Sequence, residues 1–129
     1  MPALPVDCQI TFLYTADLAR SASFYEGALG LKLALDQGGC RIYRVTGSGA
    51  YIGVCQAADA PVEPAGIIFT LVTREVDGWY ERITGQGWEC EHAPRYNDVY
   101  DIYHFFVRDP AGYRIEIQRF PQADWDQSG

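Results

Sequence analysis

The feature that most constrains the fold of this chain is an internal duplication. Residues 8–57 and 66–120 each follow the order of one strand, one helix and three further strands, with a repeat period of about 57 residues. An alternating strand pattern beside one amphipathic helix predicts a sheet covered on one face by that helix. The order βαβββ-βαβββ therefore predicts an α+β fold within a single domain over residues 1–129, in which two curved mixed sheets surround a cavity.

In the first half, the helix boundaries are predicted by local signals. Asp17 follows an alternating segment over 9–15 and suits a helix N-cap. Gly30 follows the last apolar position of the helical pattern and suits the residue after a helix C-terminus. Glycine-containing breaks then separate three predicted strands, which span 31–35, 41–46 and 51–55.

The second half repeats this order after a proline-containing linker over 58–66. Residues 67–72 predict the first strand, and Thr73 suits the N-cap of the helix that follows. The three remaining strands are predicted at 88–92, 100–108 and 113–119. The last two flank the turn Asp109-Pro110-Ala111-Gly112, where proline and glycine each suit their turn positions.

Strand alternation predicts which side chains face the helices. Ile52 and Val54 in the first half, and Ile115 and Ile117 in the second, have the parity of residues packed beneath a helix. Gly53 and Glu116 then lie on the opposite face. Because burying an unpaired charge is costly, Glu116 requires water, a partner or a cavity on that face.

Composition and charge exclude several classes of partner. The chain has 17 acidic residues against 10 Lys and Arg, a net charge of −7. This balance opposes binding to nucleic acid or to an anionic membrane, because both need clustered cations. No apolar segment approaches the ~20 residues of a membrane span, and the N-terminus lacks the features of a signal peptide. We therefore expect a cytoplasmic protein.

The cysteines suggest neither a metal site nor a redox motif. Cys8, Cys40, Cys55 and Cys90 are widely separated and form no Cys-x-x-Cys or Cys/His ligand spacing. In a cytoplasmic chain, we expect them to be free and partly buried thiols.

Three segments resemble the vicinal oxygen chelate superfamily, which includes glyoxalase I, extradiol dioxygenases, and fosfomycin- and bleomycin-resistance proteins. They are residues 17–25 (DLARSASFY), 28–31 (ALGL) and 109–116 (DPAGYRIE). Together with the duplicated pattern, the resemblance covers about residues 8–120. It implies a fold in which two βαβββ modules surround a cavity for a small organic molecule, but it does not define the reaction.

The resemblance also implies where a metal would be held, namely on the first and last strands of each module. The projected positions are Ile10, Gly53, Ile67 and Glu116, of which only Glu116 has a donor atom in its side chain. A one-residue shift would bring in Gln9 but would leave two positions empty. Because a transition metal normally needs three or more protein ligands, we expect no metal and no other cofactor.

The predicted catalytic residues are Glu116 and His104. If His104 faces the cavity, the pair could position or transfer a proton, because histidine titrates near ~6.5. Two structural alternatives remain open: His104 as a histidine with a satisfied hydrogen bond, and Glu116 as the partner of Arg114, Arg41 or Arg44. His92, before Ala93 and Pro94, is interpreted as a loop residue.

Aromatic and cationic residues complete the predicted ligand site. Phe12, Tyr14, Tyr51, Phe69 and Phe106 are projected onto cavity faces, and Arg114 accompanies Glu116 on the last strand. Arg95, Tyr96 and Tyr100 belong to a connecting segment that could contact an anionic or aromatic ligand.

Two classes of function follow from this site. The first is a lyase- or isomerase-like enzyme that uses Glu116 and His104 without a metal; the second is a non-catalytic binder that sequesters a drug or metabolite. A metal-dependent lyase or dioxygenase remains a further alternative. Exposed sheet edges and the family resemblance also suggest a symmetric homodimer.

Overall fold

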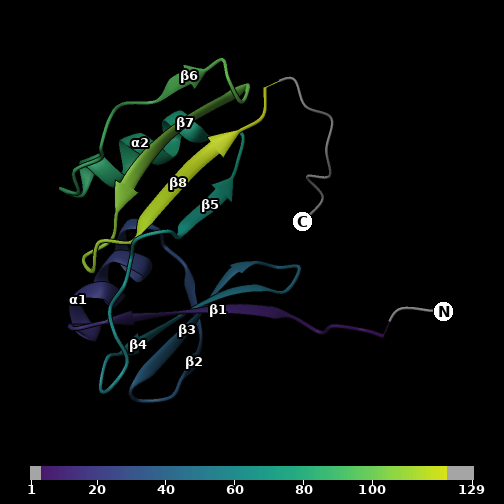
Figure 1. The fold of residues 1–129 in the computed structure, drawn as a ribbon. Helices are drawn as coiled ribbons and strands as arrows, with labels where there is room; N and C mark the ends of the chain where they lie inside the picture. The colour runs from purple at the N-terminus through teal and green to yellow at the C-terminus, as the bar shows by residue number, and fades with distance from the viewer. Residues whose placement is uncertain (1–3, 122–129) are drawn as a thin grey trace. The chain divides into compact units, whose positions relative to one another are not determined.

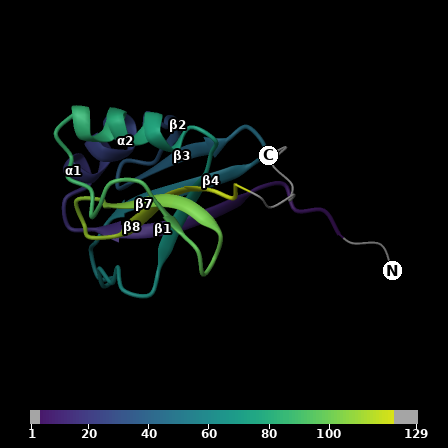
Figure 2. The ribbon, with the colours of Figure 1, turned by 90° about the horizontal axis from the view of Figure 1, so that it is seen from above.

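The duplicated fold is confirmed by the computed structural model, which describes residues 4–121. The chain divides into two compact units, the first ending at Val62 and the second beginning at Glu63. We call them unit 1 and unit 2. Each contains one four-stranded mixed sheet and its own helical segment (Figure 1). Figure 2 shows the ribbon from above, where β4, β7 and β8 can be followed along their lengths.

Unit 1 follows the predicted order of strand, helix and three strands. Its elements are β1 (Gln9–Thr15), α1 (Leu18–Ser23), one π-helical segment η1 (Phe24–Ala28), β2 (Lys32–Asp36), β3 (Cys40–Thr46) and β4 (Ala50–Gln56). The sheet order is β1-β4-β3-β2, in which β1 runs parallel to β4 and the other neighbours are antiparallel. The first strand therefore forms one edge of the sheet.

Unit 2 repeats this topology. Its elements are β5 (Ile68–Val72), α2 (Val76–Gly85), β6 (Arg95–Asn97), β7 (Ile102–Arg108) and β8 (Arg114–Arg119). The sheet order β5-β8-β7-β6 matches that of unit 1, with β5 parallel to β8. The α+β fold with two βαβββ modules is therefore as predicted.

The helices cover the predicted faces of both sheets. Asp17 caps α1 by accepting a hydrogen bond from the Arg20 backbone, and Gly30 follows the helical segment with a φ of 64°. In unit 1, α1 packs on β4, where Ile52 and Val54 are buried. In unit 2, α2 packs on β7 and β8 and covers Ile115 and Ile117, both fully buried. Burying two such side chains contributes roughly 3–6 kcal/mol to the stability of the sheet.

One predicted strand is wrong. Residues 88–92 form only an isolated bridge between Cys90 and Val107, and the fourth strand of the sheet is instead β6. Pro94 lies between these two segments and lacks the N–H group that a ladder requires, so continuous pairing begins after it. Arg95 and Tyr96 are consequently strand residues, whereas the sequence placed them in a connecting loop.

The predicted N-cap of the second helix is also wrong by two positions. Glu75 is the N-cap of α2, and its backbone N–H donates to the Thr73 hydroxyl at 3.0 Å. Thr73 therefore stabilises the turn before the helix rather than the first turn itself.

The expectation of four free thiols is wrong for two of them. Cys40 and Cys55 form a disulfide, while Cys8 and Cys90 are free. The two bonded residues are Cα partners on β3 and β4, so the antiparallel ladder places their side chains on one face. Their separation of 15 residues gave no indication of this pairing at the sequence level.

Within residues 4–121, no helix is long and apolar enough to cross a lipid bilayer.

Candidate functional site

Unit 2 brings Glu116 and His104 together on one face of its sheet. Glu116 on β8 pairs with Phe106 on β7 and with Thr70 on β5, and His104 pairs with Gln118. Paired residues in a sheet point to the same face, and so do alternate residues along a strand. The predicted proximity of His104 and Glu116 is therefore present, on the face opposite α2.

The Glu116 carboxylate is surrounded by hydrogen-bond donors. His104 Nδ1 lies 2.8 Å from Glu116 Oε2, and the Thr70 hydroxyl donates to Oε1 at 3.0 Å. The Gln118 amide nitrogen, when turned toward Glu116, donates to the two carboxylate oxygens at 3.2 Å and 3.0 Å. His104 is only 6% exposed and Glu116 9% exposed, so water cannot replace these partners freely.

These contacts define how the histidine can act. An ionised carboxylate only accepts hydrogen bonds, so the Nδ1 atom of His104 must carry the proton that it shares with Glu116. In the neutral ring, the Nε2 atom then has the free lone pair. Such an arrangement fixes the tautomer and orientation of the imidazole and stabilises the ring when Nε2 accepts a proton.

His92 is the site residue that the sequence interpretation missed. It lies in an irregular segment, as predicted, but its ring centroid is 5.5 Å from that of His104 and 5.9 Å from that of Phe106. Its Nδ1 atom contacts the Ala93 carbonyl oxygen at 2.8 Å, which leaves Nε2 as an acceptor. Among the residues that the structure describes, this Nε2 is the one buried side-chain nitrogen or oxygen without a hydrogen-bond partner. No periodic pattern could have revealed it, because the segment is irregular.

Arg114 makes its hydrogen bonds to another carboxylate, that of Glu91. Its guanidinium donates two hydrogen bonds to Glu91, at 2.9 Å and 2.8 Å, and lies 3.7 Å from the Phe106 ring centroid. Hydrogen bonding to Arg114 lowers the pKa of Glu91 below its ordinary value of 4.5. Arg41 pairs with Glu26 instead. The carboxylate of Glu116 is therefore bonded to His104 and not to either of these arginines.

Three predicted aromatic residues lie on the corresponding face of unit 1. Phe12 pairs with Gly53, and Tyr14 and Tyr51 share their parity along β1 and β4. Phe12 and Tyr14, with the Cys40–Cys55 disulfide, Gln37, Gly39 and Gln56, line an open groove of about 580 Å³. A Cβ atom on Gly53 would overlap the Phe12 ring, so this ring occupies the space above the glycine.

Other predicted ligand residues are dispersed. Phe69 pairs with Ile115 on the α2 side of the sheet, so its predicted cavity face is wrong. Arg95 pairs with His104 and shares its face, whereas Tyr96 pairs with Tyr103 on the other face. Tyr100 is a turn residue and is 73% exposed.

The error at Phe69 is a one-residue register error that also affects Ile67. Along the chain, the N-cap Glu75 follows Ile68 by the same number of residues as the N-cap Asp17 follows Ile10. The position equivalent to Ile10 is therefore Ile68 rather than Ile67.

The donor set does not fit the metal that the family resemblance implies. The projected positions are now Ile10, Gly53, Ile68 and Glu116, and isoleucine and glycine side chains have no donor atoms. The carboxylate of Glu116 is already hydrogen-bonded on both oxygens, and the Phe12 ring covers Gly53. No group of three or more His, Cys, Asp or Glu residues within 4–121 has the arrangement of a metal site.

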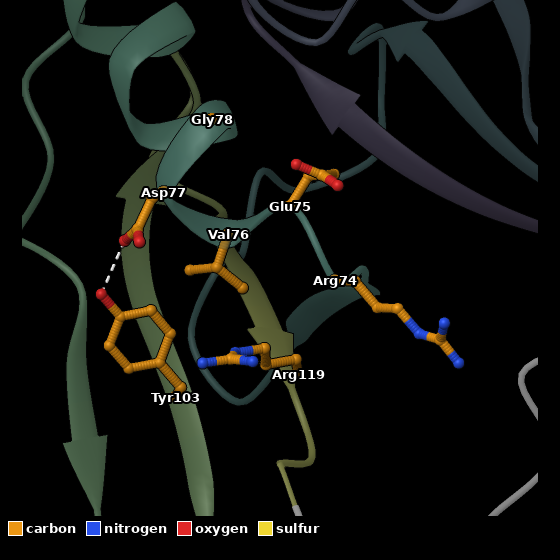
Figure 3. A pocket seen from close by; sticks show the side chains of 7 residues that line it. All are labelled: Arg74, Glu75, Val76, Asp77, Gly78, Tyr103 and Arg119. Atoms are coloured by element: carbon orange, nitrogen blue, oxygen red, sulfur yellow. Dashed lines mark hydrogen bonds between the residues drawn. The ribbon is translucent and has the colours of Figure 1, made fainter.

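A second pocket, of about 220 Å³, lies at the beginning of α2. Figure 3 shows the Tyr103 hydroxyl bonded to Asp77, at 2.6 Å, with Arg119 beside this pair and Arg74 extending away from it. The Arg119 guanidinium lies 5.0 Å from the Tyr103 ring centroid. Both arginines and Asp77 are solvent-exposed. The side chains that line this pocket are thus mostly charged and exposed to solvent.

The fold and the duplicated topology agree with a comparison of the sequence with known families. Residues 8–117 match the Glyoxalase/Bleomycin resistance protein/Dioxygenase superfamily, and the chain belongs to it. No curated protein sequence matches the chain.

Solved structures of this superfamily share the fold at low sequence identity. A glyoxalase/bleomycin resistance protein/dioxygenase from Nocardioides is 22% identical with a TM-score of 0.73, over 100% of this chain and 93% of that one. A lactoylglutathione lyase from Agrobacterium tumefaciens is 23% identical with a TM-score of 0.73, over 95% and 100%. A glyoxalase-related enzyme from Fulvimarina pelagi is 19% identical with a TM-score of 0.76, over 93% and 92%. At these identities, the likeness supports the fold alone.

Proposed function

We propose that this chain is a metal-independent, lyase- or isomerase-type enzyme that acts on a small organic molecule through Glu116 and His104. The observation that carries the proposal is the buried hydrogen bond of 2.8 Å between His104 Nδ1 and Glu116 Oε2. A histidine held in one tautomer by a carboxylate is a recurring arrangement for proton transfer.

In this proposal, His104 Nε2 is the general base. It removes a proton from a carbon next to a carbonyl group and returns it to the neighbouring position or to the leaving group. The Glu116 carboxylate stabilises the imidazolium that forms, while Thr70 and Gln118 hold the carboxylate in place. The resulting reaction class is isomerisation or elimination at a carbon that is acidified by a carbonyl group.

Support for a small organic ligand comes from the surrounding groups. The rings of Phe106 and His92 pack against His104, and the buried Nε2 of His92 is an acceptor suited to a ligand N–H or O–H group. A few polar atoms among aromatic walls are typical of small-molecule sites.

A non-catalytic binder is the second candidate, and the groove of unit 1 favours it. Phe12 and Tyr14 are 47% and 39% exposed there and share one face of β1, so they give the groove an aromatic wall. Such a surface could hold a planar drug or metabolite without any proton transfer.

Deuterium exchange separates the two candidates. Thermal-shift screening of carbonyl metabolites and aromatic drugs, with a chelator present, first identifies ligands. Each ligand is then incubated with the protein in D₂O, and proton NMR measures the loss of the C–H signal next to the carbonyl. The enzyme proposal expects exchange that His104→Gln and Glu116→Gln both abolish. Binding without exchange would support sequestration, and exchange that survives His104→Gln would overturn the assignment of the base.

We also propose a symmetric homodimer. In both sheets, the first strand is an edge, and Ile68 and Val72 on β5 are 50% and 39% exposed. Exposed apolar edges favour pairing with a second copy. Light scattering at tens of micromolar checks this, and a particle of 14.4 kDa would contradict it.

A further inference from the structure

The Cys40–Cys55 disulfide lies at positions that carry polar chemistry in unit 2. The ladder pairs Ile42 with Gly53 in unit 1 and Phe106 with Glu116 in unit 2. Two residues further along the same strands, the ladder pairs Cys40 with Cys55 and His104 with Gln118. The disulfide of unit 1 therefore lies on the same sheet face, and at the same ladder pair, as His104 and Gln118 of unit 2.

The disulfide lies at the boundary between the core of unit 1 and an open groove. Both cysteines line the groove of about 580 Å³, with Cys40 half-buried and Cys55 6% exposed. Thiol exchange can reduce a disulfide that a thiol can reach, and the groove leads to this one at Cys40, its more exposed member.

The groove offers few other ligand atoms. Its lining contains no carboxylate, imidazole, ammonium or guanidinium group among the described residues. The Gln56 amide is committed, because its oxygen accepts from the Leu18 backbone and its nitrogen donates to the Ala16 carbonyl. Besides the neutral Gln37 amide and the Tyr14 hydroxyl, which are hard ligand groups, the groove offers the two sulfurs as its soft ligand atoms.

We propose that the reduced Cys40/Cys55 pair is a binding site for one soft, two-coordinate cation of the Cu⁺ type. Thiolates select soft ions, and a structural Zn²⁺ site needs four protein ligands, which this groove does not supply. Cross-strand partners on one face can both reach a single ion, because their side chains start next to each other. This inference is independent of the proposed function of unit 2.

The redox chemistry of the site requires a dithiol reductant. The reductant supplies two electrons and two protons, the S–S bond breaks to give two thiols, and the reductant itself becomes a disulfide. The cation then displaces one proton from each thiol and forms two metal–sulfur bonds. The cytoplasm expected from the sequence would favour the reduced form. The oxidised pair has no thiolate and cannot bind in this way.

The test uses the full chain with Cys8→Ser and Cys90→Ser, so that the remaining thiols belong to the proposed site. The protein is reduced with dithiothreitol, and the reductant is then removed under anaerobic conditions. The reduced protein is titrated with Cu⁺ in competition with a chromophoric Cu⁺ chelator. We expect one Cu⁺ per chain in the reduced protein and none in the oxidised protein. Adding Cys40→Ser or Cys55→Ser should lower the affinity by on the order of 100-fold or more, because one thiolate loses the effective concentration of the second.

Comparison of the oxidised and reduced forms keeps the test decisive even if a serine variant folds poorly. Circular dichroism of each variant reports whether it folds. Cu⁺ bound equally by the oxidised protein would overturn the proposal, as would affinity unchanged by Cys40→Ser in a folded variant. Zn²⁺ that competes with Cu⁺ at equal concentration would also overturn it, because further ligands would then have to be present.

Discussion

Units 1 and 2 have the same strand order and the same ladder pairing, yet the sheet faces opposite their helices carry different chemistry. Matched positions hold Phe12 and Thr70, Gly53 and Glu116, Cys40 and His104, and Cys55 and Gln118. Unit 1 therefore has an aromatic ring over a glycine beside a disulfide. Unit 2 has a buried carboxylate bonded to a histidine, a threonine and a glutamine. The ladder thus sets the face to which a side chain points, and the residue type decides which contacts it can make there.

The helix-facing sides of the two sheets differ much less. Val54 in unit 1 and Ile117 in unit 2 are both buried beneath a helix, at 1% and 0% exposure. Apolar packing limits these positions, because changes in volume there create cavities or overlaps. The opposite faces are not packed beneath these helices, so their residue types can differ between the two units.

The largest expected effect tests the polar site of unit 2. His104→Gln and Glu116→Gln should each lower turnover by about 10²–10⁴-fold, the usual contribution of a general base. The double variant should lose little more than either single one, because both residues form one unit. Steady-state kinetics on a substrate identified by deuterium exchange measures all three.

Glu89→Gln is the matched control, since it removes the same charge from an exposed position of unit 2. Its turnover should equal that of the unmodified chain. Additive losses in the double variant would show that His104 and Glu116 do not act together. We expect Glu116→Gln to stay folded but to lose about 1–3 kcal/mol of stability, because its amide NH₂ would face one of the donors that converge on the carboxylate.

The second effect concerns the disulfide that only unit 1 possesses. In oxidising buffer, Cys40→Ser should lower the free energy of unfolding by about 3 kcal/mol, the chain-entropy value for a loop of this length. In dithiothreitol, the variant and the unmodified protein should unfold at similar urea concentrations. A difference that persists in reductant would show that the sulfur contributes through packing instead.

The third effect tests whether the Phe12 ring fills the space above Gly53, which is the position that matches Glu116 of unit 2. Gly53→Ala should destabilise the protein by about 1 kcal/mol, because the new Cβ overlaps the ring and the half-exposed ring must turn aside. Phe12→Ala in the same chain should remove that penalty. Urea unfolding gives both values.

Gly47→Ala is the control for this pair, since a Cβ there meets nothing within 4 Å. If Gly53→Ala and Gly47→Ala are equally mild, the ring does not restrict position 53. The chain could then accept a longer side chain there without other changes.

The duplicated fold could be predicted because its signals are local and repeated. Asp17, Gly30 and the alternation around Gly53 and Glu116 each specify a cap or a face, and all agree with the structure. The parity of Glu116 against Ile115 and Ile117 was enough to separate the polar face from the buried one.

Errors arose where tertiary pairing overrides local pattern. The observed register of β5 differs by one residue from the predicted one, so Phe69 shares the face of Ile115 and not that of Glu116. The disulfide and the ring contacts of His92 join segments whose spacing carries no local signal. The roles of His104 and Glu116 remain predictions, because position on a face does not establish a reaction.

The smallest expected effect concerns the ion pair beside the unit 2 site. Hydrogen bonding to Arg114 lowers the pKa of Glu91, so the carboxylate stabilises the fold above its unfolded value of 4.5. This stabilisation is lost as the pH falls through the lower folded pKa. Side-chain exposures of 32% for Arg114 and 29% for Glu91 allow solvent screening, so Glu91→Gln should cost at most about 1 kcal/mol at neutral pH. Urea unfolding from about pH 7 to about pH 3 should show the unmodified protein and the variant converging in acid. A constant difference across this range would mean that the Glu91 charge is not its source. Turnover of Glu91→Gln at neutral pH adds a second readout. If the stability difference disappears in acid as expected but turnover of the variant is also lower, the Arg114 guanidinium released from Glu91 would be competing with His104 for Glu116.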